Sequence, residues 1–344
     1  MAFQNSYTYK LLNLIGSPFV KDSQEIKIDN PIPIYDFAKI NRIRLLGLDR
    51  LLRQQVNPFL EQEYRKLQER NKGVLRVLTQ VSELFSKNEI NFVFFKTLRP
   101  YEEFTVDLDI LIFGDDFNLA VKTLIDTGCI ILEEGPLATT LLDKNIPLNL
   151  DLHDEIGISH IVYLDKNKLH NYVKLRELDN NILVPTFDSK TDLLTLIAHS
   201  IIKEHLYTLS EYFTTLGLLN DMNDSDLCSF VELAENCHIR YAASTHLSIT
   251  AFLHQYAYGF VPVKLKKLIE SLVPLSKESL NLLKSDYSMP HRYSTIVIGK
   301  SILDLFKEPR TRKSLTVQIK HMSNPHFNSK FFKALFHHMS RKSY

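Results

Sequence analysis

The sequence predicts an α+β protein in which a helical segment precedes a small, sheet-containing core and a helical domain follows it. Helical spacing of apolar residues dominates up to residue 87, short apolar runs typical of strands fill residues 88–188, and helical spacing returns from residue 189. With 344 residues and 44% hydrophobic side chains, the chain is long and apolar enough to bury an ordinary core. We therefore predict an N-terminal helical segment at 1–87 that packs on the core, an α/β core at 88–188, and a C-terminal helical domain with a basic tail at 189–344.

Two helices are predicted before the core. In residues 36–56 the apolar side chains recur at helical spacing, and the polar side of this helix is basic. Asn57-Pro58 ends the helix or kinks the chain, because a residue that precedes proline favours extended conformations. A longer amphipathic helix follows at about 61–87.

The core is predicted to combine several strands with one helix. The strands are expected at 91–95, 104–113, 129–132 and 147–153, with a short edge strand at 182–184 before Pro185, and the helix at 115–128. Beyond the core, a long helix is expected at 192–219 and further helices across 226–257, 264–283 and 294–307.

Composition limits the functional classes. The formal net charge of +1 gives no whole-molecule argument for binding nucleic acid or a membrane. The N-terminus lacks the long apolar stretch of a secretory signal, and no run of about eighteen apolar residues occurs, so no membrane-spanning helix is expected. Three cysteines without paired spacing are expected to be reduced thiols in a cytoplasmic protein.

The segment at 104–113, FTVDLDILIF, carries the main chemical signal. Side chains alternate between the two faces of a strand, so Asp107 and Asp109 share one face while the other face is apolar. Two carboxylates about 5 Å apart repel by about 3 kcal/mol at an effective dielectric constant near 20. The apolar flanks predict a central strand, where water relieves this repulsion poorly; on an edge strand both side chains would simply face solvent.

A divalent cation bound between the carboxylates is the most economical way to offset this repulsion. Oxygen ligands indicate Mg²⁺ or Mn²⁺ rather than Zn²⁺, because no cysteine or paired histidine accompanies them. In PLNLDLH, at 147–153, an antiparallel or adjacent strand could bring Asp151 beside the first pair and complete a two-metal centre. His153 shares the face of Asp151 but is not assigned as a ligand, because a hydrogen-bond partner of a ligand or a packed polar residue fits it equally well.

Lys96 and Thr97 directly follow the strand predicted at 91–95, where a buried strand reaches a loop. At such a position a lysine can reach a triphosphate, and backbone N–H groups together with the Thr97 hydroxyl can bind its oxygens. The alternative for Lys96 is a solvated loop lysine.

Taken in order, these motifs resemble the uncharacterised nucleotidyltransferase family of the DNA polymerase β-like superfamily. A helical prelude is followed by a strand ending in Lys96-Thr97, then by Asp107-Leu-Asp109-Ile-Leu-Ile, a helix ending at Gly128, and Leu150-Asp151-Leu152-His153. The family typically reads LKG, DIDLLV and DLH at the three motif positions. The resemblance covers roughly residues 36–220.

The resemblance implies a small mixed sheet flanked by helices and followed by a helical domain. It also implies transfer of a nucleoside monophosphate from an NTP, such as ATP, to an acceptor that could be RNA, a protein hydroxyl or a small molecule, with release of pyrophosphate. The metal and catalytic carboxylates would be Asp107, Asp109 and Asp151, and Lys96 would counter the charge of the leaving pyrophosphate. Superfamily members often place a lysine of the second domain on the phosphates, which would be Lys203; ordinary helix packing is the alternative for Lys203 and for His199, one turn before it.

The chain departs from the family pattern at two points. Thr97 stands where the family usually has glycine, and Glu102-Glu103-Phe104 precede the acidic strand where an arginine is frequent. These departures favour an alternative, a catalytically degenerate nucleotidyltransferase fold that binds nucleotide or RNA for regulation, whereas the three retained carboxylates favour the enzyme. A metal-dependent phosphohydrolase on an unrelated sheet lacks the expected motifs.

The stretch at 300–344 is the strongest charge asymmetry, with ten lysines and arginines against two acidic residues. Its phenylalanines interleave with histidines. It could follow a nucleic-acid backbone, with RNA as the partner, or contact anionic lipid or another protein as a basic amphipathic helix. It could equally dock its phenylalanines on the body while its lysines stay solvated. Neither the acceptor, the preferred NTP nor the oligomeric state follows from the sequence.

Overall fold

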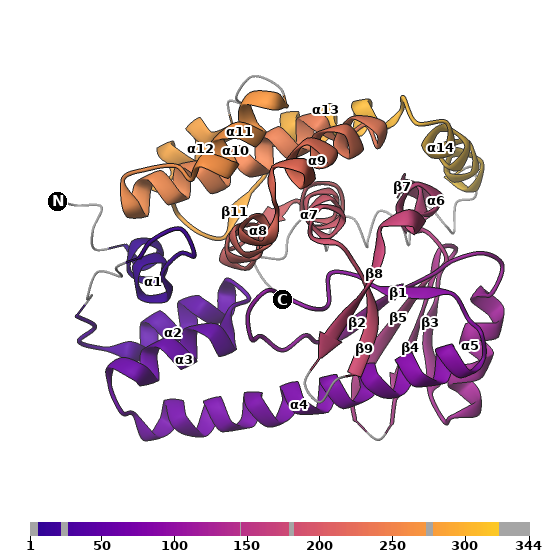
Figure 1. The fold of residues 1–344 in the computed structure, drawn as a ribbon, viewed down its shortest axis with the longest axis horizontal. Helices are drawn as coiled ribbons and strands as arrows, with labels where there is room; N and C mark the ends of the chain where they lie inside the picture. The colour runs from indigo at the N-terminus through magenta and orange to yellow at the C-terminus, as the bar shows by residue number, and fades with distance from the viewer. Residues whose placement is uncertain (1–5, 22–26, 145, 179–181, 273–277, 323–344) are drawn as a thin grey trace.

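A mixed sheet of seven strands lies between two layers of helices, and a further group of helices stands beside it (Figure 1). The computed structural model describes residues 6–21, 27–144, 146–178, 182–272 and 278–322. The combination of this sheet with many helices confirms the predicted α+β class. The division of the chain after residues 87 and 188 stays a prediction.

The sheet has the strand order β3-β4-β5-β2-β1-β9-β8. Its strands are β1 (Phe92–Phe94), β2 (Asp107–Ile112), β3 (Ile130–Glu134), β4 (Ala138–Asp143), β5 (Leu148–His153), β8 (Val173–Leu178) and β9 (Ile182–Phe187). β2 runs parallel to β5 and β1 runs parallel to β9, whereas the other neighbouring pairs are antiparallel. The strand with the two aspartates is therefore central, as its apolar flanks predict.

The prediction of a short edge strand that ends before Pro185 is wrong in two respects. β9 continues through Pro185, and β8 pairs outside it with Leu175 opposite Pro185. β1 and β9 pair at the single position Phe94–Thr186, so the missing N–H of Pro185 interrupts little of that ladder. β4 and β8 were not predicted, and neither were two short antiparallel pairs, β6 (Ile156–Ile158) with β7 (Ile161–Leu164) and β10 (Leu206–Tyr207) with β11 (His291–Arg292).

The N-terminal region forms three helices, α1 (Tyr7–Ile15), α2 (Pro31–Ile40) and α3 (Arg44–Gln54). The single helix predicted over 36–56 is therefore wrong, because the apolar spacing continues through the break and gives no sign of it. At the break Arg42 takes a left-handed φ of 58°. Asn41 fixes the turn: its Nδ2 donates to the Phe37 carbonyl (3.1 Å), and its Oδ1 accepts from the Leu209 N–H (3.2 Å).

α4 (Pro58–Lys87) lies along one face of the sheet (Figure 1). Asn57 caps this helix by accepting from the N–H groups of Phe59 and Leu60, and Pro58 fits the first turn, where no N–H is needed. Together with α5 (Phe117–Asp126), α4 covers the apolar side of the central strands. The buried cluster between them includes Val77, Leu78, Val81, Leu108, Ile110 and Leu150.

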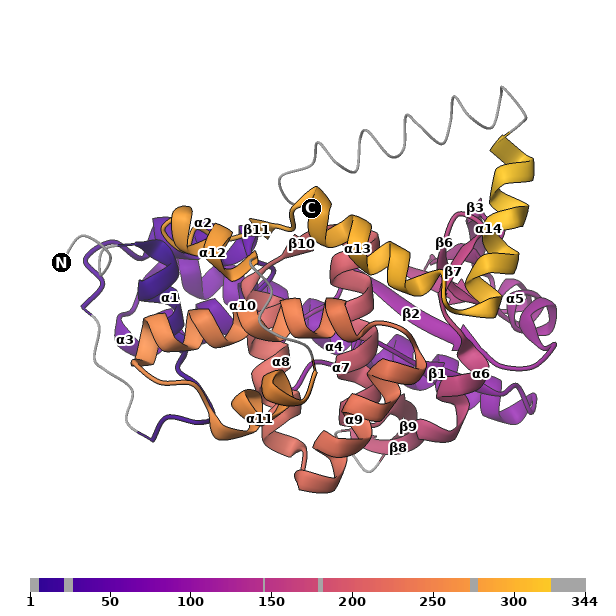
Figure 2. The ribbon, with the colours of Figure 1, turned by 90° about the horizontal axis from the view of Figure 1, so that it is seen from above.

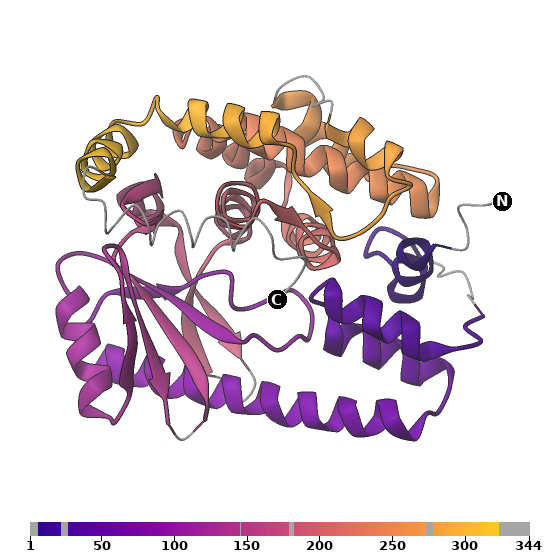
Figure 3. The same cartoon turned by 180° about the vertical axis from the view of Figure 1, so that it is seen from behind.

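The C-terminal helices lie on the side of the other face of the sheet, and α7 is the one that packs on that face (Figure 3). These helices are α7 (Ser189–Ala198), α8 (Leu209–Asp221), α9 (Asp224–Asn236), α10 (Arg240–Tyr258), α11 (Val263–Ser271), α12 (Glu278–Lys284), α13 (Thr295–Leu305) and α14 (Pro309–Met322). A short helix α6 (Lys166–Leu169) and a 3-10 turn (His170–Tyr172) lead into β8. Leu111 of β2 and Phe95, directly after β1, join Leu193 and Ile197 of α7 in one apolar cluster.

The continuous helix predicted over 192–219 is broken. α7 ends at Ala198, a π-helical turn follows at His199–Glu204, and His205 takes a left-handed φ of 55° before β10. The Ser200 hydroxyl donates to the Leu206 carbonyl (2.9 Å) and ties the two sides of the reversal together. The amphipathic pattern runs through this region and did not predict the break.

Segments far apart in the sequence lie side by side at two places (Figure 2). α1 packs on α10, where the Tyr258 hydroxyl donates to the Leu12 carbonyl (2.6 Å). α14 packs beside β7, where the Thr311 hydroxyl donates to the Val162 carbonyl (2.8 Å). No helix in the described ranges combines the length and the apolar character that crossing a bilayer requires.

Gly217 in α8 allows a test of how tightly the loop after β1 is held. A Cβ atom at position 217 would lie 2.4 Å from Cγ of Pro100, which lies within that loop. We predict that Gly217→Ala lowers the free energy of unfolding by about 1–3 kcal/mol, because the helix or the loop must shift. Urea unfolding measures the change.

The matched control is Gly299→Ala in α13, where no heavy atom lies within 4 Å of the Cβ position. This change should be neutral or stabilise by up to about 1 kcal/mol through helix propensity. Equal stabilities of the two variants would contradict the close packing of α8 against the loop.

Candidate functional site

The parallel pairing of β2 with β5 places the acidic residues on the same face of the sheet. Asp109 lies opposite Asp151, and Asp107 lies opposite Asn149. The intervening residues Leu108 and Leu150 are fully buried on the other face, under α4 and α5. Asp151 therefore reaches the first aspartate pair from an adjacent strand, as the sequence analysis suggests, although the strand is parallel to β2.

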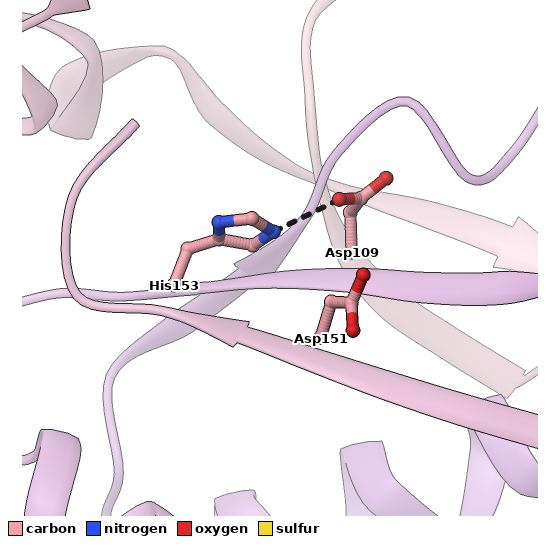
Figure 4. A group of neighbouring side chains, drawn as sticks. All are labelled: Asp109, Asp151 and His153. Carbon is pink, nitrogen blue, oxygen red and sulfur yellow. Dashed lines mark hydrogen bonds and ion pairs between the residues drawn. The ribbon is translucent and has the colours of Figure 1, made fainter. Parts of the chain in front are cut away.

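Asp109, Asp151 and His153 form a compact group of potential ligands (Figure 4). One donor atom from each lies within 4.8 Å of the others, and the His153 Nε2 is 2.9 Å from Asp109 Oδ1. The Thr140 hydroxyl, from β4, donates to Asp151 Oδ1 (2.6 Å) and orients that carboxylate. Burial lowers the pKa of His153, which favours the neutral ring that a metal ligand requires.

Asp107 lies next to this group but is not part of it. The Thr105 hydroxyl is 3.2 Å from Asp107 Oδ1. Burial, together with the nearby charges of Asp109 and Asp151, raises the pKa of Asp107 to about 6. Burial is the larger cause of this shift, and repulsion by the two neighbouring carboxylates adds to it. That Asp107 is a metal ligand stays a prediction.

Lys96 is in direct contact with the acidic group. Its Nζ lies 3.1 Å from Asp109 Oδ1, and its side chain is only 7% exposed. Burial lowers the pKa of Lys96, with the Asp109 carboxylate opposing this shift. Burial would by itself raise the pKa of Asp109, but Lys96 and His153 hold it well below the ordinary value. Lys96 is therefore no solvated loop lysine.

Thr97 joins β1 to β2 through its side chain. Its hydroxyl donates to the Phe95 carbonyl (3.3 Å) and accepts from the Asp109 N–H (3.2 Å). The left-handed conformation in this loop belongs to Lys96, with a φ of 62°, and not to the position where the family pattern has glycine. The role of Thr97 in binding phosphate oxygens stays a prediction.

A cavity of about 310 Å³ opens beside Asp107 and Asp109. Three parts of the chain supply most of its charged and polar walls, and Glu211 of α8 adds to them. The three parts are the α2–α3 region with Arg42 and Arg44, β1–β2 with Lys96, Asp107 and Asp109, and the π-helical turn with His199, Lys203 and Glu204. Lys203 is thus brought to the site, as predicted from the resemblance, while its role stays a prediction. The sequence analysis noted the basic side of residues 36–56 but did not connect it with the acidic strand.

The donor set fits a divalent cation. Carboxylate oxygens suit Mg²⁺ and Mn²⁺, and an imidazole nitrogen in the set favours Mn²⁺ or another transition metal over Mg²⁺. The raised pKa of Asp107, which burial and two neighbouring carboxylates cause, would fall again if a cation balanced their charge. The Lys96 ammonium already balances part of it.

The basic C-terminal stretch is described up to residue 322. In that part Arg310 donates to Asp165 (2.9 Å) and also pairs with Glu155, while Lys307 pairs with Asp304 (2.7 Å). Some of the predicted basic surface is therefore engaged in ion pairs within the chain. The lysines, arginines and phenylalanines of this prediction that run from Phe327 to Lys342 lie outside the described residues, whereas Lys300, Arg312, Lys313 and Lys320 lie within them.

No family model and no curated protein matches the chain. Among solved structures, one titled as a STING-associated CdnE c-di-GMP synthase from Capnocytophaga granulosa is 12% identical to the chain. The match covers 89% of this chain and 96% of the other, with a TM-score of 0.28. A similarity at this level supports neither a shared activity nor a shared substrate, so the site rests on its own geometry.

Asp107 gives a prediction for the pH dependence of stability. Its pKa is about 6 in the fold against an ordinary value of 3.8, so the folded state binds more protons between these values and stability falls as pH rises through them. Without divalent metal, Asp107→Asn should raise the free energy of unfolding at about pH 8 by about 1–3 kcal/mol and have little effect near pH 3. Urea unfolding in EDTA at both pH values measures this.

Asp115→Asn, at an exposed turn, is the control and should change stability little at either pH. A pH response of Asp107→Asn identical to that of the unmodified protein would contradict the buried, charge-repelled state of this carboxylate.

Proposed function

We propose that this chain is a divalent-metal-dependent nucleotidyltransferase, which transfers a nucleoside monophosphate from an NTP to an acceptor. The observation that carries the proposal is the register of β2 and β5, which sets Asp109 opposite Asp151 on one face of the sheet. The cavity beside Asp109, with its basic residues, supports it further by offering space and charge for a triphosphate. The motif order that resembles the nucleotidyltransferase family is consistent with this geometry.

In this proposal Asp107, Asp109 and Asp151 hold Mg²⁺ or Mn²⁺, with His153 as an additional donor or as the partner of Asp109. When bound, the metal would lower the pKa of the acceptor hydroxyl and balance charge on the phosphates. The acceptor oxygen attacks the α-phosphorus, the bond to the β-phosphate oxygen breaks, and pyrophosphate leaves. In this proposal Asp151 would take the hydroxyl proton, and Lys96 and Lys203 would stabilise the charge of the leaving pyrophosphate.

The alternative is a nucleotide- or RNA-binding regulatory module that has lost catalysis. The observation that favours it is the occupation of the motif side chains by contacts within the protein. Asp109 Oδ1 accepts from Lys96 and contacts His153, and the Thr97 hydroxyl is used between β1 and β2. An active enzyme would have to exchange some of these contacts when substrate binds. RNA as a partner and a cytoplasmic location stay predictions.

The decisive experiment combines a binding and a turnover assay. The protein is incubated with each α-labelled NTP and Mg²⁺ or Mn²⁺, together with cellular RNA, protein and sugar phosphates as acceptors. We predict that label transfer and metal-dependent NTP binding both fall by about a hundredfold or more in Asp109→Asn and in Asp151→Asn, because each change removes a ligand charge from the centre. Asp115→Asn should retain both.

The outcomes separate the candidates. NTP binding that depends on metal and on Asp109, without label transfer to any acceptor, would establish the binding module. Binding and transfer that persist in both aspartate variants would remove the metal centre and with it the proposed enzyme.

A further inference from the structure

The Lys96 ammonium is held from two sides. It lies 3.1 Å from Asp109 Oδ1 and 3.2 Å from His199 Nδ1. The left-handed backbone at Lys96 costs about 1–3 kcal/mol for a residue other than glycine, so the surrounding contacts must compensate for it. An ammonium has three N–H donors, and the third finds no oxygen or nitrogen acceptor in the described part of the chain, although the Phe95 ring lies 4.7 Å from Nζ.

The contacts of His199 determine which of its nitrogens carries the proton. Lysine only donates, so the Nδ1 that faces Lys96 must be unprotonated. The Nε2 lies 3.5 Å from Glu204 Oε1 and therefore carries the hydrogen. Burial, reinforced by the Lys96 charge, lowers the pKa of His199 to about 3, in agreement with a neutral ring.

Glu204 is in turn fixed by the N-terminal helices. Arg42, at the turn between α2 and α3, lies 2.9 Å from Glu204 Oε2. Burial would raise the pKa of Glu204, but His199 and Arg42 lower it, so the group stays ionised. One connected series of polar contacts thus runs from Arg42 through Glu204, His199 and Lys96 to Asp109.

The π-helical turn makes this chain of contacts possible. In an α-helix, residues five apart point about 140° away from each other, so His199 and Glu204 would face different directions. The wider π turn, whose hydrogen bonds span five residues, brings both to one side. His199, Lys203 and Glu204 all line the same cavity. Turns of this kind are frequent at functional sites.

A neutral acceptor suits a lysine that must bind an anion. A carboxylate at position 199 would orient Lys96 but would add a second negative charge to that of Asp109, whereas the imidazole lone pair orients the ammonium without adding charge. We propose that His199 and Glu204 are positioning residues, which hold the Lys96 ammonium toward the polyphosphate of a nucleotide in the cavity. This inference rests on the proposed function, because it requires that a nucleotide binds there.

The experiment compares nucleotides with their nucleosides. Calorimetry with Mg²⁺ measures the affinity of the best-bound NTP and of its nucleoside for each variant. His199→Leu should weaken NTP binding about tenfold and leave nucleoside binding unchanged, because only the charge-assisted contact to phosphate is lost. His199→Asn puts an amide oxygen close to where Nδ1 lies and should restore NTP affinity to within about threefold.

His291→Asn is the matched control. His291 is a buried histidine paired with a glutamate, Glu278 at 3.1 Å, and it does not line the cavity. This variant should lose thermal stability without changing the ratio of NTP to nucleoside affinity. A purely structural role of His199 would give the same result as this control.

A second readout does not need nucleotide. Nitrogen NMR of the His199 ring should show the neutral form with hydrogen on Nε2, and Glu204→Gln should weaken that preference. The inference would be overturned if the unmodified protein carried the hydrogen on Nδ1 of His199. It would also be overturned if His199→Leu bound NTP with an affinity within twofold of that of the unmodified protein. Failure of the unmodified protein to bind any NTP would instead reject the proposed function and the phosphate-directing role of Lys96 with it.

Discussion

The site depends on the register between two parallel strands. Because side chains in a strand alternate, a shift of β5 by one residue against β2 would turn Asp151 into the apolar layer beneath the sheet. The apolar side of the same strands prevents this shift, since Leu108 and Leu150 are fully buried against α4 and α5. The hydrophobic core on one face of the sheet therefore sets the positions of the carboxylates on the other face.

The electrostatics of the site follow from this enforced proximity. The energetic cost of burying carboxylates that repel each other is offset locally, by Lys96 beside Asp109 and by basic side chains around the cavity. The compensation must be local, because the net charge of the whole chain is only +1. At Asp107 the compensation is incomplete, because burial and the neighbouring carboxylates still raise its pKa to about 6. This unbalanced charge lowers the stability of the fold and concentrates charge at one place on the protein. The ion pair between Arg42 and Glu204 connects the N-terminal helices to these charges.

Local patterns predicted the parts of the structure in which one side of an element is buried. The alternation in residues 104–113 identified β2, its central place and the shared face of Asp107 and Asp109, and the same reasoning placed Asp151. The breaks at Arg42 and at His199–Glu204 were missed, because apolar spacing continues through both and long-range contacts from α8 and β11 stabilise them. The partners of Lys96 were missed for the same reason: they lie far away in the sequence and meet it only in the folded chain.

The cavity walls come from residues as far apart as Lys39 and Glu211. During synthesis, the chain emerges from its N-terminus, and domains fold as their residues become available. The acidic strand leaves the ribosome well before the π-helical turn and α8, so the cavity cannot close until nearly two thirds of the 344 residues have been made. In the interval the aspartates lack His199, Lys203 and Glu204 opposite them. The nascent chain therefore lacks this cavity early, and any ligand that binds there acts only on the late stages of folding.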